Sequence, residues 1–190
     1  MQVALEEAGV AYERIWVSKE PADVEKLKQV NATGKVPALK LPDGSVMIES
    51  AAMLLYLAQQ YPGKLGPAPQ SQSYAPFLQW MVFLAANVYE SALRMYYPAR
   101  YSSRGEADAE AVQTQATKEF IAHLKFIARA LNPYVLGADY SIADVYLYML
   151  ATWHRGDIDE LYREIPALGR LAGLVRQRAQ VAKVEADHAQ

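Results

Sequence analysis

The second half of the chain carries the clearest pattern of hydrophobic positions. Apolar residues recur at helical spacing in two long stripes, which predict an amphipathic helix over residues 74–97 and a second over residues 108–131. A shorter run at residues 146–151 is apolar on every side, so we expect a buried helix there. Strand signals are lacking throughout this half, and we therefore predict that it is all α-helical.

The first third of the chain mixes helical and strand patterns. Turn residues at Pro42-Asp43-Gly44 separate two short β-rich runs and predict a hairpin. Aromatic and β-branched residues before Pro21 predict a strand. The expected order is a helix at residues 1–8, a strand at 11–17, a helix at 22–30, a hairpin at 38–48 and a helix from Ser50.

The two halves are joined by a segment of different composition. Residues 65–73 are rich in Pro, Gly, Gln and Ser and contain few apolar residues, which is typical of a linker. We therefore predict an α/β domain at residues 1–64 and an all-α domain at residues 71–190. A ligand site is expected in the crevice between them, because small-molecule sites often lie at domain interfaces.

Residues 31–57 contain the densest set of candidate ligand-binding residues. Val36 precedes a proline, which favours an extended backbone whose amide and carbonyl can pair with a ligand. Pro37 itself has no amide hydrogen, so strand pairing stops there. Ser50 lies where a helix begins, and unpaired amides at a helix start bind carboxylates or phosphates. An ordinary N-cap is the alternative interpretation of Ser50 alone.

The sharpest local signal in the second half is a capping box before the apolar helix. Ser141 and Asp144 have the spacing at which each side chain can bond the backbone amide of the other residue. Tyr140 can pack on Val145 as a hydrophobic staple. We interpret this box as a folding element.

Composition narrows the function classes. The 190 residues include no cysteine, which excludes disulfides, thiolate metal sites and a cysteine nucleophile. A net charge of −2 with interspersed charges favours neither nucleic acid nor an anionic membrane as a partner, and no apolar run is long enough to span a bilayer. His123, His154 and His188 lack ligand spacing, so we expect no metal site. A cytoplasmic location is the default expectation.

One segment resembles a known family. Gly34-Lys35-Val36-Pro37-Ala38-Leu39, with Asp43-Gly44, Ile48-Glu49-Ser50 and Tyr56-Leu57, is similar to the glutathione-binding segment of the cytosolic glutathione transferases. The resemblance implies a thioredoxin-like N-terminal domain, here incomplete, and an α-helical C-terminal domain. It also implies detoxification chemistry, in which glutathione is the co-substrate and its thiol is transferred to a small apolar electrophile.

The resemblance further implies roles for particular residues. It places Val36 and the expected cis-proline, Pro37, at the cysteinyl part of glutathione, and it places Lys35 near the glycyl carboxylate. Glu49 and Ser50 would hold the γ-glutamyl end. A homodimer is implied, with the helix after Ser50 and the long helix at the interface. The hydrophobic substrate pocket is expected at Tyr89, Tyr96, Tyr97 and Tyr101, although aromatic residues at helical spacing are also typical of a core.

The expected thiol-activating residue is absent from the sequence. In the family, a first strand and a loop bearing Ser, Tyr or Cys precede the helix that residues 1–8 resemble. We therefore expect the catalytic residue upstream of Met1, in a longer protein. The alternative is a non-catalytic binding or scaffold protein. A third possibility is a relative that binds glutathione but acts as a peroxidase, dehalogenase or isomerase.

Overall fold

The computed structural model describes residues 1–189. Its N-terminal part holds three helices and one small hairpin: α1 (Gln2–Ala8), α2 (Pro21–Val30), β1 (Leu39–Lys40), β2 (Val46–Met47) and α3 (Ser50–Gln60). The strands are antiparallel, and Leu39 pairs with Met47. Gly9 ends α1 with φ 74°, a left-handed conformation that glycine adopts without steric cost. These features confirm the predicted helices and the predicted hairpin.

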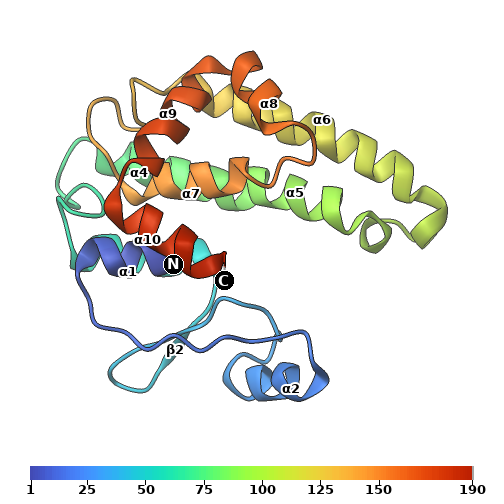
Figure 1. The fold of residues 1–190 in the computed structure, drawn as a ribbon, viewed down its shortest axis with the longest axis horizontal. Helices are drawn as coiled ribbons and strands as arrows, with labels where there is room; N and C mark the ends of the chain where they lie inside the picture. Colours follow the sequence, from blue (N-terminus) through green and yellow to red (C-terminus); the bar gives the residue numbers. More distant parts are fainter. Residues whose placement is uncertain (190) are drawn as a thin grey trace.

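The strand expected at residues 11–17 is wrong. This segment forms no β-ladder, and it runs as an extended connection between α1 and α2 (Figure 1). Ile15 and Trp16 are 76% and 57% exposed. Aromatic and β-branched residues favour an extended backbone, but a strand also requires a neighbour for its amides and carbonyls. Among the described residues, the one sheet contains only β1 and β2, so no strand is paired with this segment.

The remainder is a helical assembly in which α5 and α6 run side by side along the long axis (Figure 1). Its elements are α4 (Tyr74–Phe83), a π-helix (Leu84–Val88), α5 (Tyr89–Tyr96), 3-10 helices at Pro98–Tyr101 and Gly105–Asp108, α6 (Ala109–Ala128), α7 (Ile142–Ala151), α8 (Ile158–Glu164), α9 (Pro166–Arg176) and α10 (Ala179–His188). The predicted helix over residues 74–97 is confirmed, with a π-helical turn inside it. In residues 1–189, no helix combines the length and the apolar character needed to cross a membrane.

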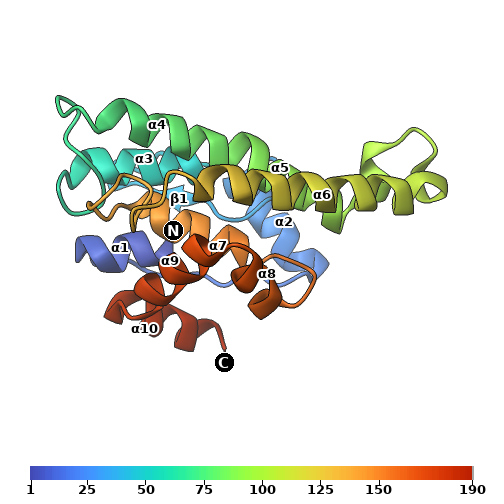
Figure 2. The ribbon, with the colours of Figure 1, turned by 90° about the horizontal axis from the view of Figure 1, so that it is seen from above.

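Helix α7 is the centre of the core. It contacts α4 on one side and α9 on the other, and Figure 2 shows α4 and α10 at opposite sides of the molecule with α7 between them. The predicted capping box is present at its start. The Ser141 amide donates to Asp144 Oδ2 at 2.7 Å, and the Val135 amide donates to Oδ1 at 2.8 Å. The Ile142 amide donates to the Leu65 carbonyl at 2.7 Å, which attaches the segment after α3 to this helix.

An ion pair between a buried carboxylate and a partly exposed guanidinium joins the first helix to the last part of the chain. Arg178 donates from Nε and Nη2 to the two carboxylate oxygens of Glu7, at 2.6 and 2.7 Å. The guanidinium carbon lies 3.6 Å from the ring centre of Tyr140, whose hydroxyl donates to Glu7 Oε1 at 3.2 Å. We call Glu7, Tyr140 and Arg178 the terminal clasp. It fixes α1 against the junction of α9 and α10, and both ends of the chain lie on this side (Figure 1).

Candidate functional site

The hairpin delivers the chain to the start of α3 through an unusual backbone conformation. Glu49 has φ 69°, the only positive φ among the described non-glycine residues. Such conformations are uncommon outside glycine and concentrate at functional sites. Ser50 is the first residue of α3, as predicted, and no side chain caps this helix end. The amides of Ser50, Ala51 and Ala52 therefore have no partner among residues 1–189, as an anion site requires.

The loop before β1 places a second set of unpaired backbone groups nearby in the sequence. Val36 is 61% exposed, and no hydrogen bond of the described residues uses its amide or its carbonyl. The Val36–Pro37 peptide bond is cis, as the family resemblance implied. Lys35 is also exposed, and its carbonyl accepts from Asn31 Nδ2 at 2.7 Å.

Asn31 is a residue whose role the sequence analysis missed. It is buried at the end of α2, where its side-chain oxygen accepts from the amide and the hydroxyl of Thr33 at 3.1 and 2.8 Å. Together with its bond to the Lys35 carbonyl, this fixes the loop that leads to Val36. An asparagine directly after a predicted helix is the signal that could have revealed this role.

The side chains near Glu49 come from two distant helices. Burial, followed by the nearby charge of Glu49, raises the pKa of the Tyr89 hydroxyl in α5. The pKa of Tyr146 in α7 is raised by burial, by Tyr89 and by the same Glu49 charge. The charge of Glu49 thus contributes to the raised pKa of both phenols, and both remain protonated at neutral pH. The ring of Trp153 lies 5.6 Å from that of Tyr89, and neither Trp153 nor Tyr146 was among the site residues predicted from the sequence.

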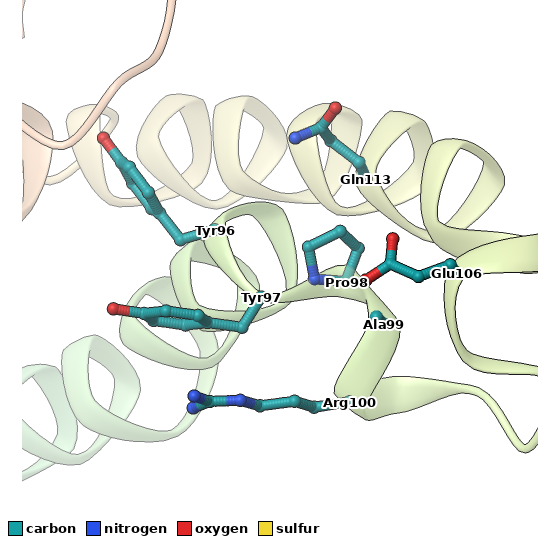
Figure 3. A pocket seen from close by; sticks show the side chains of 7 residues that line it. All are labelled: Tyr96, Tyr97, Pro98, Ala99, Arg100, Glu106 and Gln113. Carbon is teal, nitrogen blue, oxygen red and sulfur yellow. The ribbon is translucent and has the colours of Figure 1, made fainter.

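The four tyrosines expected at the substrate pocket fall into separate places. Tyr96 lies seven residues after Tyr89 on the same helix face, and its hydroxyl donates to the Trp153 carbonyl at 3.0 Å. Beyond it, an open cavity of about 500 Å³ is lined by Tyr96, Tyr97, Pro98, Ala99, Arg100, Glu106 and Gln113 (Figure 3). Tyr89 and Tyr101 do not line this cavity.

The three histidines lie in different environments. His123 packs edge-on against Phe83, His154 stacks on Phe120, and His188 packs edge-on against Trp16. Among residues 1–189, no group of three or more His, Cys, Asp or Glu side chains is arranged to hold a metal ion.

The sequence is similar to glutathione S-transferases and to GST-like proteins. Residues 2–60 match the family described as glutathione S-transferase, N-terminal domain. The chain is 30% identical over 158 residues to the uncharacterized GST-like protein YncG of Escherichia coli K12, covering 78% of this chain and 73% of YncG. It is 29% identical over 127 residues to glutathione S-transferase GstA of Escherichia coli O157:H7, covering 65% of this chain and 59% of GstA.

The fold is also similar to that of a solved glutathione S-transferase. The sphingomonad glutathione S-transferase complexed with glutathione is 30% identical, with a TM-score of 0.79 over 100% of this chain and 93% of that one. The small sheet followed by many helices fits a thioredoxin-like N-terminal part and an α-helical C-terminal part. The chain belongs to the glutathione S-transferase family.

Proposed function

We propose that this protein is a glutathione transferase that binds glutathione in the crevice between residues 1–64 and residues 71–190. The observation that carries the proposal is the start of α3, where unpaired amides adjoin Glu49, whose charge adds to the effect of burial in raising the pKa of Tyr89 and Tyr146. Glutathione is a peptide with two carboxylates and one ammonium group, and this arrangement offers partners for both charges. The sphingomonad relative in complex with glutathione supports the same ligand.

The parts of the crevice match the parts of the peptide. The α-carboxylate of the γ-glutamyl group would accept from the Ser50 amide and hydroxyl, and its ammonium would donate to Glu49. The unpaired amide and carbonyl of Val36, beside Pro37, would pair with the cysteinyl residue in the manner of an added strand. Lys35 would lie near the glycyl carboxylate.

The chemistry is nucleophilic attack by the glutathione thiolate on an apolar electrophile. A carbon–sulfur bond forms, the leaving group departs with the bonding electron pair, and the thiol proton passes to solvent. A hydroxyl donor at the sulfur favours the thiolate and so raises the rate at neutral pH. With the Ser50 hydroxyl engaged by the γ-glutamyl carboxylate, Tyr89 is the hydroxyl group that the crevice offers to the sulfur, and its raised pKa keeps its proton available for donation. Tyr89 and Tyr96, which share one face of α5, would form part of the wall for the electrophile, and Tyr97 lines the cavity beyond them.

We also propose a homodimer and a cytoplasmic location. The outer surface of α4 and α6 carries an aromatic patch made of Trp80, Phe83 and Phe126. Phe126 is 47% exposed, and its ring lies 5.2 Å from that of Phe83 and 5.9 Å from that of Trp80. A second copy of the chain, docked through α3 and this long helix, would cover the patch. The absence of cysteine suits a reducing compartment.

Glutathione affinity tests the proposal. Calorimetry should detect binding to the wild type, and Glu49→Ala or Ser50→Ala should each weaken it by about 1–3 kcal/mol through a lost charge-assisted contact. Glu13→Ala removes an exposed carboxylate from the extended segment and should leave the affinity unchanged. A wild type that neither binds glutathione nor melts at a higher temperature in its presence would favour the scaffold alternative.

A further inference from the structure

We propose that Arg100 is a specificity-determining residue and that the cavity at Tyr96 and Tyr97 selects electrophiles carrying a carboxylate on a planar aromatic ring. The inference rests on the proposed function, because it names the acceptor substrate of that site. It departs from the purely apolar pocket that the tyrosines alone predict. The reason lies in how the chain turns after α5.

The turn after α5 places a guanidinium against an aromatic ring. Pro98 opens a 3-10 helix directly after Tyr97, and the Arg100 amide donates to the Tyr97 carbonyl at 3.1 Å. In a 3-10 turn, side chains three residues apart lie one above the other. Arg100 and Tyr97 obey this rule, since the guanidinium carbon lies 4.3 Å from the centre of the Tyr97 ring.

The positive charge of Arg100 has no protein partner among residues 1–189. No carboxylate of this region forms an ion pair with it, whereas Arg104, four residues later, is paired with Asp108. The nitrogens of Arg100 are therefore free to bind a ligand. A guanidinium in this position can pair with a carboxylate through two parallel hydrogen bonds.

The other lining residues leave this charge available and add a surface for a ring. Figure 3 shows the Arg100 side chain extended beneath Tyr97, with Glu106 at the opposite end of the cavity. Glu106 is thus placed where it does not neutralise the guanidinium. Tyr96 and Tyr97 are both nearly half exposed and line the cavity. A volume of about 500 Å³ accommodates a substituted aromatic molecule.

Tyr96, which lines the cavity, and Tyr89, at the proposed reaction site, lie on one face of α5. Both contact Trp153, and the charge of Glu49 contributes to the raised pKa of Tyr89. Seven helical residues correspond to a rise of about 10 Å between Tyr89 and Tyr96. An acceptor bound in the cavity can therefore extend its reacting carbon toward glutathione while Arg100 holds its anionic end.

A matched pair of ligands tests the inference without requiring turnover. Naphthalene-2-carboxylate and naphthalene-2-carboxamide share a ring and a shape, and they differ in charge. Calorimetry on the full chain should show the carboxylate binding at least about fivefold more tightly, a preference that falls as salt concentration rises. Arg100→Gln should abolish the preference and change carboxamide affinity less than twofold. Arg100→Lys should retain part of it.

The control variant and a parallel measurement separate the two proposals. Arg129 directly follows α6, about 24 Å along the helix axis from Gln113, which lines the cavity. Arg129→Gln removes the same charge as Arg100→Gln and should preserve the preference for the carboxylate. Glutathione affinity is measured on the same samples. If glutathione binds but the wild type does not prefer the carboxylate, or if Arg100→Gln keeps the preference, the inference about Arg100 is overturned. If the preference depends on Arg100 but glutathione does not bind, the cavity stands and the transferase proposal fails.

Discussion

Replacing Asp144 tests the account of the core most sharply. Its carboxylate is fully buried and accepts from the amides of Val135 and Ser141 at 2.8 and 2.7 Å, and from the Ser141 hydroxyl at 3.3 Å. Asp144→Ala leaves both buried amides without an acceptor, at a cost of about 1–3 kcal/mol each. We expect the free energy of unfolding to fall by about 4 kcal/mol, a large fraction of the 5–15 kcal/mol typical of a domain.

The measurement is urea unfolding followed by circular dichroism. Asp144→Asn keeps one acceptor oxygen but points an amide group at a donor, so we expect about half the loss. Asp139→Ala removes an exposed carboxylate from the same loop and should change stability by less than about 0.5 kcal/mol. A loss below about 1 kcal/mol for Asp144→Ala would show that the two amides find other partners, and the proposed role of the box would be refuted.

The same carboxylate gives a dependence of stability on pH. Burial raises the pKa of Asp144 from 3.8 to about 6, while the hydrogen bonds from Val135 and Ser141 pull it down. Between pH 4 and 6 the native state therefore binds more protons than the unfolded state, so rising pH lowers the free energy of unfolding. The difference across this window is about 3 kcal/mol. It should appear in the wild type and disappear in Asp144→Asn, and an unchanged pH profile in that variant would contradict the assignment.

Two further substitutions test the clasp and the dimer. Arg178→Gln leaves the buried Glu7 carboxylate without its cation, so the free energy of unfolding should fall by about 3 kcal/mol in urea titrations. The double variant Glu7→Gln, Arg178→Gln should recover part of this loss. A double variant that is equally unstable would argue against an ion-pair role. Phe126→Asp places a charge in the exposed aromatic patch and should convert a dimer to a monomer in sedimentation experiments. A persistent dimer would place the interface elsewhere.

The features that could be predicted from the sequence are those that neighbouring residues decide. The Ser141–Asp144 box, the left-handed Gly9 and the hairpin turn each depend on a few adjacent residues. The long helix of α4 and α5 could be predicted because its apolar positions form a stripe along one face, and that face must be buried. Ser50 at the start of α3 could be predicted for the same reason.

The features that escaped prediction depend on contacts between distant residues. The segment at Tyr12 has strand-like composition, yet a strand needs a partner that composition does not supply. Nothing in the local sequence shows that Trp153 would contact both Tyr89 and Tyr96. Arg100 was also not predicted as a site residue. Exposed arginines are common at helix ends, and only the structure shows that this one stacks on Tyr97.

The terminal clasp determines how late in translation the fold can be completed. Glu7 leaves the ribosome early, but Arg178 is synthesised 171 residues later. Until then, the carboxylate that the native fold buries has no cation, and α1 has no α10 to pack against. The N-terminal part cannot complete its fold as an independent unit, so the segment that carries Glu49 and Ser50 acquires its final support only near the end of translation.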